Sequence, residues 1–196
     1  MEKVRKIILF LESSRKYGRD LVRGIAKYSQ LNGPWTFYKE DTFYSRFERH
    51  SKNFSWIKRW GADGIITRDF EALHKLIELN LPIIAVEAFQ ENLGNVIEIV
   101  SDHQAIGQLA ADYFKRKGFK NFAFCGFNDL PWSVHREQNF ARILNEDCHE
   151  LYIFNSNSSR LLRWDQEYLN LIEWLEFLPK PVAILCCNDE DRKSVV

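Results

Sequence analysis

Short apolar segments alternate along this chain with segments whose apolar residues recur at helical spacing, and this alternation restricts the possible folds more than any other feature. The first apolar segment, Lys6 to Glu12 (KIILFLE), has an unbroken apolar centre, as expected for a strand covered on both faces. Residues Asp20 to Leu31 then repeat apolar side chains at helical spacing, and Asn32-Gly33-Pro34 ends that pattern. A regular order of strand and helix with short connections predicts an α/β fold, in which parallel sheets are flanked by helices.

The same alternation continues to the end of the sequence. The further predicted strands are Trp35–Tyr38, Gly64–Thr67, Pro82–Val86, Val96–Val100, Phe122–Phe127, Leu151–Phe154 and Val182–Cys186. The further predicted helices are a short one with Trp56 and Trp60, then Phe70–Asn80, Asp102–Lys117, Val134–Asn145 and Trp164–Phe177. We expect one complete lobe over residues 1–118 and the first part of a second, incomplete lobe over residues 119–196. A second sheet of three strands would leave an edge uncovered, so we expect the sequence to be a fragment.

Acidic and basic residues are equal in number, and this balance argues against one class of function. The sequence has 27 Lys and Arg against 27 Asp and Glu, for a net charge of +0. A nucleic-acid-binding domain usually carries a basic surplus, because it must neutralise phosphates. We therefore expect these residues to contact neither DNA nor a membrane. The apolar run after the charged start is too short for a signal peptide, so we expect a cytoplasmic protein.

Motifs that would indicate a cofactor or a catalytic centre are missing from the sequence. The turn after the first strand has no GxGxxG, and neither a GxxxxGK[ST] phosphate loop nor a GxSxG nucleophile elbow occurs. The five histidines are far apart, and the four cysteines show no CxxC spacing. We therefore expect no cofactor, no metal site and no catalytic residue.

Polar and aromatic residues follow the carboxyl ends of the predicted strands, where open α/β sheets bind their ligands. They are Glu12–Tyr17, Thr67–Asp69, Glu87–Phe89, Asp102, Asn128–Trp132, Asn155 and Asn188–Asp189. Carboxylates and amides bind hydroxyl groups, and an aromatic ring covers the C–H face of a sugar, so this mixture suits a small polyhydroxyl ligand. The same residue types also form turns and helix caps without any ligand, and Asp102 is placed to cap the helix that follows it. Glu12, Tyr17 and Trp132 are candidates on position alone, and Trp132 could equally be a core residue.

Three segments of the sequence resemble the sensor domains of LacI/GalR-type regulators. Residues Ser101–Gly126 match the crossover between lobes, with an Asp, a Gly five residues later and then the first strand of the second lobe. Arg136–Phe140 resembles the family's Arg-x-x-Gly-Phe/Trp helix, except that Asn139 stands in place of the Gly. Ala183–Asp189 resembles the strand that ends in Asn-Asp. The resemblance implies a periplasmic-binding-protein-like (type I) fold with a sugar site between two lobes.

The start of the sequence indicates which group of regulators within this family the chain resembles. It opens directly at the first sensor strand, which is similar to regulators of xylose operons, whose AraC-type DNA-binding domain follows the sensor. The resemblance implies that a pentose, with xylose as the first candidate, is the ligand and that Asp102, Arg136 and Asp189 contact it. It also implies that operator DNA is bound only through a domain absent from this sequence, and that the full-length protein is a homodimer.

Two other classes of function stay open at this point. A transport receptor of the same fold would need a signal sequence encoded upstream. A sugar-modifying enzyme could use Asp102, Asp129 and Asp189 for acid–base chemistry, but no nucleophile, base and orienting group can be recognised together. Turnover of a pentose by the purified protein would decide for the enzyme.

Overall fold

A computed structural model describes residues 3–39, 54–88, 93–157 and 164–187 of the chain, and it divides the chain into two compact units. Unit 1 comprises Met1–Val100 and unit 2 comprises Ser101–Val196. The helix that begins after Asp102 therefore belongs to unit 2, whereas the sequence analysis included it in the first lobe. It belongs there because it packs along another helix of the same unit.

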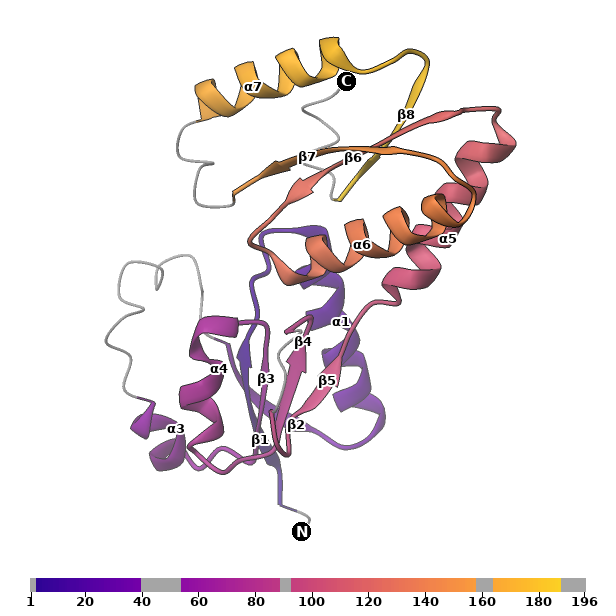
Figure 1. Ribbon diagram of the computed structural model, residues 1–196. Coiled ribbons are helices and arrows are strands. Elements are labelled where there is room, and N and C mark those ends of the chain that lie inside the picture. Colours follow the sequence, from indigo (N-terminus) through magenta and orange to yellow (C-terminus); the bar gives the residue numbers. More distant parts are fainter. Residues whose placement is uncertain (1–2, 40–53, 89–92, 158–163, 188–196) are drawn as a thin grey trace. The chain divides into compact units, whose positions relative to one another are not determined.

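Unit 1 is a parallel sheet of five strands in the order β2-β1-β3-β4-β5 (Figure 1). The strands are β1 (Arg5–Phe10), β2 (Trp35–Lys39), β3 (Gly64–Thr67), β4 (Ile83–Val86) and β5 (Ile97–Ile99). The helices are α1 (Lys16–Leu31), α3 (Ser55–Trp60) and α4 (Phe70–Ile77). All neighbouring strands are parallel, so the predicted α/β fold with parallel sheets is confirmed.

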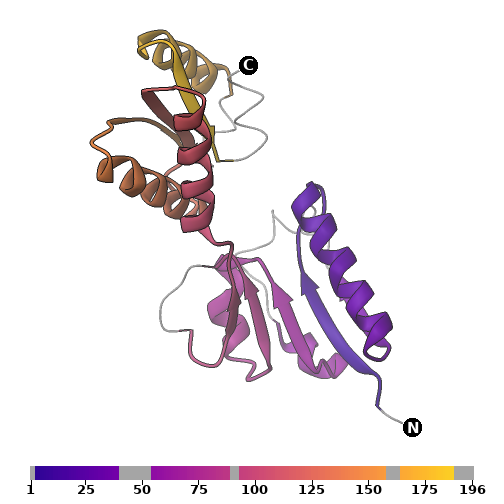
Figure 2. The same ribbon diagram turned by 90° about the vertical axis from the view of Figure 1, so that its right-hand side faces the viewer.

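The unbroken apolar run of β1 is explained by helices on both faces of this sheet. Ile8 and Phe10 pack into the core beneath α3 and α4. Ile7 and Leu9 point to the other face, where α1 supplies Leu21 and its neighbours. Figure 2 shows α1 set apart on its own side of the sheet. Burial of both faces leaves the ends of the strands as the places where polar side chains can gather.

Unit 2 is a parallel sheet of three strands in the order β7-β6-β8. The strands are β6 (Asn121–Phe127), β7 (Leu151–Ser156) and β8 (Val182–Cys186), and the helices are α5 (His103–Arg116), α6 (Pro131–Glu146) and α7 (Trp164–Phe177). Phe122 and Phe124 of the central strand pack with Phe140 in a core that α5 and α6 cover. Helix α7 lies on the opposite face of this sheet (Figure 1). Its Trp174 contacts Phe154 of β7, with ring centroids 5.3 Å apart.

Gly107 of α5 lies close against the backbone of α6. A Cβ at this position would lie 3.0 Å from the backbone nitrogen of Phe140 and 3.2 Å from the carbonyl carbon of Asn139. Both of these atoms are backbone atoms, so no side chain could turn away to make room. A larger residue than glycine would therefore require the two helix backbones to move apart by a few tenths of an ångström.

Two helices begin earlier than the sequence predicts. Helix α1 starts at Lys16 rather than Asp20, and α6 starts at Pro131 rather than Val134. Proline is well suited to the first helical turn, because its missing N–H has no partner there anyway. As a result Tyr17 and Trp132 lie in first helical turns and not in loops.

Candidate functional site

Polar side chains gather at the carboxyl end of the sheet in each unit, and we describe the two groups separately. In unit 1 they come from the segments after β1, β3 and β4, which are neighbours in the sheet. Because all three strands are parallel, their carboxyl ends meet at one edge. The residues concerned are Glu12, Tyr17, Arg68, Asp69 and Glu87.

The carboxylate of Glu12 stabilises the turn that follows β1. Its carboxylate Oε1 accepts a hydrogen bond from the backbone N–H of Ser14. Partial burial raises the pKa of Glu12, but the hydrogen bonds from Ser14 and the nearby charge of Arg15 outweigh burial, so that its pKa lies below the usual range. The carboxylate is thus ionised at neutral pH and shapes the loop that leads into α1.

Tyr17 lies with two charged residues from other strand ends. The guanidinium of Arg68 stacks over its ring at 4.8 Å from the centroid. Burial and the nearby carboxylate of Glu87 raise the pKa of Tyr17, and the charge of Arg68 opposes them only in part. Tyr17 is 45% exposed, so one side of the ring is open to a ligand while the other is held by the cation.

Glu87 also belongs to this group. It was among the strand-end residues in the sequence but was not chosen as a site residue. It follows β4 directly, is only 3% exposed, and adopts a left-handed backbone with φ of 57°. Its N–H donates to the carbonyl of Ile99 at 2.9 Å, which secures this conformation. A buried acidic residue with a strained backbone at a strand end is typical of functional positions. The sequence signal was a carboxylate immediately after a fully apolar strand.

Asp69, by contrast, has a structural role. Its carboxylate caps α4 by accepting a hydrogen bond from the N–H of Ala72 at 3.2 Å. Its own N–H donates to the hydroxyl of Thr67 at 2.9 Å. Asp69 therefore forms a turn and a helix cap, as polar residues after strands commonly do.

In unit 2 the group at the carboxyl end of the sheet centres on Arg136. Its Nη1 donates to the carbonyl oxygen of Cys187, just after β8. Its guanidinium also lies over the ring of Trp132, 5.5 Å from the centroid. Trp132 in turn contacts Phe127 at the end of β6, with ring centroids 6.4 Å apart. Trp132 thus packs against the core and also against the guanidinium of Arg136.

Asn155 joins this group from the end of β7. Its Nδ2 donates to the carboxylate of Glu137, the residue after Arg136. Its Oδ1 is buried and accepts no hydrogen bond from the residues that the structure describes. A buried amide oxygen without a donor is costly, and a ligand hydroxyl is a group that could satisfy it. Asn155 was among the strand-end residues in the sequence but was not chosen as a site residue.

Asp102 caps α5, as its position predicts. Its Oδ1 accepts from the N–H of Ala105 at 2.8 Å, and the side chain lies at the surface. The second carboxylate oxygen is available for other contacts. Asp189, the remaining predicted ligand contact, lies outside the described residues.

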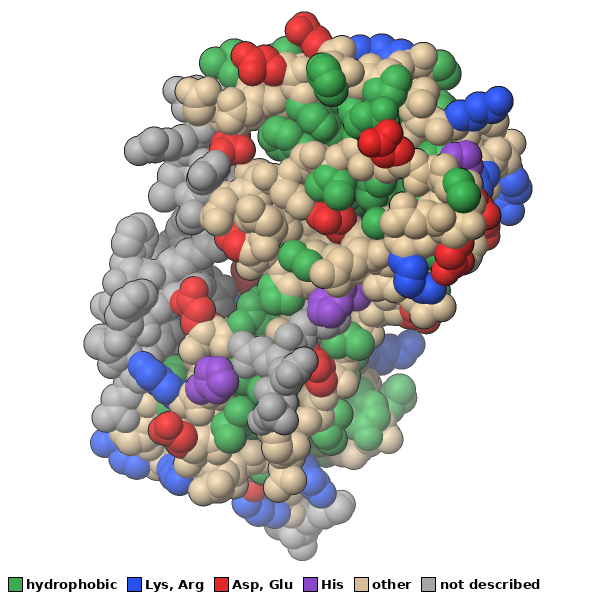
Figure 3. All heavy atoms as spheres, in the orientation of Figure 1, with side chains coloured by type: hydrophobic (Ala, Val, Ile, Leu, Met, Phe, Trp, Pro, Cys, Tyr) green, Lys and Arg blue, Asp and Glu red, His purple; other side chains and the backbone are tan. Residues whose placement is uncertain are grey.

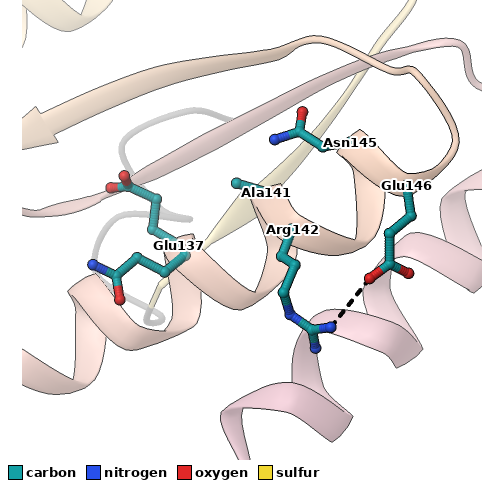
Figure 4. A pocket seen from close by; sticks show the side chains of 6 residues that line it. Glu137, Ala141, Arg142, Asn145 and Glu146 are labelled. Carbon is teal, nitrogen blue, oxygen red and sulfur yellow. Dashed lines mark hydrogen bonds and ion pairs between the residues drawn. The ribbon is translucent and has the colours of Figure 1, made fainter.

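One hollow on unit 2 is lined by side chains of a single helix. It runs along α6 and is lined by Glu137, Ala141, Asn145 and the ion pair that joins Arg142 to Glu146 at 3.1 Å (Figure 4). All of these residues come from one helix and no strand end contributes to the hollow, so we do not place the site there. Acidic and basic side chains are spread over both units on the face shown in Figure 3.

The described residues contain no group of three His, Cys, Asp or Glu side chains that could hold a metal ion. Among the helices that the structure describes, none is both long enough and apolar enough to cross a membrane.

Two family models match the chain, one in each unit. The XylR N-terminal domain matches residues 6–101, and the periplasmic binding protein-like domain matches residues 111–196. Together the two matches account for most of the chain.

Curated relatives match over nearly the full chain. The xylose operon regulatory protein of Escherichia coli K12 is 25% identical over 203 residues, which cover 99% of this chain and 50% of the relative. The protein of the same name from Haemophilus influenzae is 27% identical over 206 residues, covering 100% of this chain and 51% of the relative. The chain thus spans about half the length of these relatives.

Solved structures with the same fold include a structure described as the xylose-binding transcription activator xylR. It has a TM-score of 0.77 and 22% identity, covering 99% of this chain and 49% of that one. A periplasmic binding protein/LacI regulator from Alkaliphilus metalliredigens, complexed with D-xylulofuranose, has a TM-score of 0.69 and 18% identity, covering 97% of this chain and 70% of that one.

Proposed function

We propose that the chain is the sensor of a sugar-responsive transcription regulator, because it resembles xylose operon regulatory proteins over nearly its whole length and matches the periplasmic binding protein-like domain over residues 111–196. We propose further that its ligand is a pentose, with xylose as the first candidate, and that the strand-end residues of each unit, taken by itself, are suited to contact a sugar. Binding of DNA is assigned to another part of the full-length protein, in keeping with the net charge of +0 here. A regulator of this kind acts in the cytoplasm, and we propose that it does so as a homodimer.

The observation that carries the proposal is the group around Arg136 in unit 2. A guanidinium presents donors in a planar arrangement that suits neighbouring hydroxyls. The buried Oδ1 of Asn155 is an acceptor in the same group. Asp189, which the family resemblance places at the sugar, would add a carboxylate acceptor. Donors and acceptors in one group fit a neutral polyol, because each sugar hydroxyl both donates and accepts.

In unit 1 the corresponding residues are Tyr17, Arg68 and Glu87. The ring of Tyr17 offers an apolar face, and Glu87 is the acidic acceptor. Glu12 has a smaller part in the proposal, because its carboxylate already holds the turn at Ser14. The matched relatives are regulators and not enzymes, so no catalytic role is assigned to Asp102 or to the other carboxylates.

The test is calorimetric titration of the purified protein with D-xylose, L-arabinose and D-ribose. We expect one pentose to bind best, and Arg136→Ala to weaken it by about tenfold to a hundredfold, the equivalent of a lost hydrogen bond to a charged group. Arg142→Ala is the matched control, because Arg142 lies on the same helix but pairs only at the surface with Glu146 among the described residues. If Arg136→Ala binds every pentose like the parent, the site is wrong, and if no pentose binds to the parent, the ligand is wrong.

A further inference from the structure

Three of the four cysteines lie at the carboxyl end of the sheet in unit 2, and two of them are neighbours across strands. Cys125, near the end of β6, is the register partner of Cys186, the last residue of β8. The N–H of Cys187 donates to the carbonyl of Cys125 at 2.9 Å. This hydrogen bond continues the ladder past the cysteine pair and holds the two strands in register at that point.

The thiols of Cys125 and Cys186 project from the same face of the sheet. Side chains alternate along a strand, and register partners on parallel strands share a face. Phe124, Leu185 and Cys187 pack into the core under α5 and α6. Cys125 and Cys186 are each one position removed from these residues, so they point to the opposite face, which carries α7. Cys125 is buried and Cys186 is partly exposed.

The spacing of neighbouring strands brings this pair within reach of a disulfide. Strands in a sheet lie about 4.7–4.9 Å apart, and the Cα atoms of disulfides are about 4.4–6.8 Å apart. The Cβ atoms of register partners keep nearly the strand spacing, which slightly exceeds the separation of about 3.5–4.5 Å in relaxed disulfides. A disulfide here would need a small shift of β8 and would be strained. Strained disulfides are reduced easily and belong to the labile, regulatory kind.

We propose that Cys125 and Cys186 form a reversible redox site, at which hydrogen peroxide or an organic hydroperoxide oxidises the pair to an intramolecular disulfide. The thiol of the more exposed Cys186 loses its proton, and the thiolate attacks a peroxide oxygen. The O–O bond breaks, a sulfenic acid forms, and the departing hydroxide, or the alkoxide from an organic hydroperoxide, takes up that proton and leaves as one water or one alcohol. The sulfur of Cys125 then attacks the sulfenic sulfur. The S–S bond forms, the S–O bond breaks, and the hydroxyl leaves as water with the proton of Cys125. Two thiols are oxidised and one peroxide is reduced.

A disulfide at this pair would also affect the position of Arg136. Cys187 follows Cys186 directly, and its carbonyl accepts the hydrogen bond from Arg136. A shift of β8 toward β6 therefore moves the main-chain support of that guanidinium. The redox site itself depends only on the register of β6 and β8, and it stands whether or not a pentose is the ligand.

The experiment counts thiols on the full chain inside cells that express it. Cells are treated with hydrogen peroxide and quenched with acid, and thiols are alkylated with N-ethylmaleimide before and, with an isotope-labelled form, after reduction. Peptide mass spectrometry then reports each cysteine separately. We expect Cys125 and Cys186 to become protected together, to appear as one cross-linked peptide pair, and to return to thiols after recovery from the oxidant.

Three variants test the assignment. Cys148→Ser removes the exposed cysteine and should leave the cross-link unchanged, and so should Cys187→Ser, whose side chain lies on the other face. Cys125→Ala should abolish the cross-link and leave a sulfenic acid on Cys186 that dimedone traps. The parent chain alone also decides the question, even if Cys125→Ala does not fold. The proposal is overturned if Cys125 and Cys186 stay alkylatable, if Cys186 bridges to Cys148 or Cys187 instead, or if oxidation is irreversible.

Discussion

Replacing Gly107 by alanine should loosen the packing of α5 on α6. The added methyl group would lie 3.0 Å from the nitrogen and 3.2 Å from the Cα of Phe140, and 3.2 Å from the carbonyl carbon of Asn139. These are closer than ordinary van der Waals contacts, and all three atoms belong to the backbone of α6. The helices must therefore separate by a few tenths of an ångström, and this shift also disturbs the packing of Phe140 in the core.

Two opposing contributions set the size of the effect on stability. Overpacking of a core contact costs about 1–3 kcal/mol. Alanine in place of glycine inside a helix gains about 0.5–1 kcal/mol. The difference is a net loss of about 1 kcal/mol in the free energy of unfolding. In a unit of this size such a loss lowers the Tm by about 4–8 °C.

Gly24→Ala is the matched control, because Gly24 lies inside α1 and has no atom within 4 Å of its would-be Cβ. It should stabilise its helix by about 0.5–1 kcal/mol. Hydrogen–deuterium exchange followed by peptide mass spectrometry measures both effects, because it reports α5, α6 and α1 separately. We expect faster exchange in α5 and α6 for Gly107→Ala and slower exchange in α1 for Gly24→Ala. Slower exchange in α5 for Gly107→Ala would show that the close approach does not limit packing.

Three further predictions concern single residues and one concerns DNA. Asp102→Ala should lower stability by about 1 kcal/mol through loss of the helix cap, with Asp102→Asn nearly neutral, as compared by urea unfolding. The pKa of Glu12 is lower in the folded state than in the unfolded state. Its carboxylate therefore stabilises the fold at pH values above the unfolded-state pKa, and this stabilisation is lost as the pH falls through the folded-state pKa. The difference in urea midpoint between the parent and Glu12→Gln should shrink in acid. Tyr17 should ionise at higher pH than exposed tyrosines in an ultraviolet titration, because burial and Glu87 raise its pKa and Arg68 only partly opposes them. Arg68→Gln should move the ionisation of Tyr17 to still higher pH. These residues alone should not shift operator DNA in a gel, and a salt-sensitive, sequence-selective shift would contradict the assignment of DNA binding to another part of the protein.

The strands and their parallel orientation could be predicted from the sequence because both faces of each sheet are buried. The apolar runs at Ile7–Leu11 and Phe122–Phe127 therefore identified strands without ambiguity. Helix starts were less predictable. Lys16 and Pro131 begin helices within polar or mixed segments, where no apolar periodicity marks the first turn.

The candidate site could be predicted only in part, because strand-end position does not distinguish a cap from a ligand contact. Asp69 and Glu87 both follow strands, yet Asp69 caps a helix whereas Glu87 is buried with a left-handed backbone. That difference depends on which strands are neighbours in the sheet, and sequence alone does not give this. The family resemblance, by contrast, predicts that Arg136 contacts the sugar, and the structure places Arg136 beside Cys187 at the end of β8.

Arg136 is held in place before any ligand arrives, and this has a thermodynamic consequence. The carbonyl oxygen of Cys187 accepts a hydrogen bond from the guanidinium of Arg136, and the ring of Trp132 lies against the same guanidinium. The conformational entropy of this long side chain is therefore lost during folding and not during association. A lysine at the same position would keep the charge, but it has no planar group to stack on Trp132 and would have to become ordered when the ligand binds. Arg136→Lys should therefore bind with a less favourable entropy and a faster dissociation rate, although its net charge is unchanged.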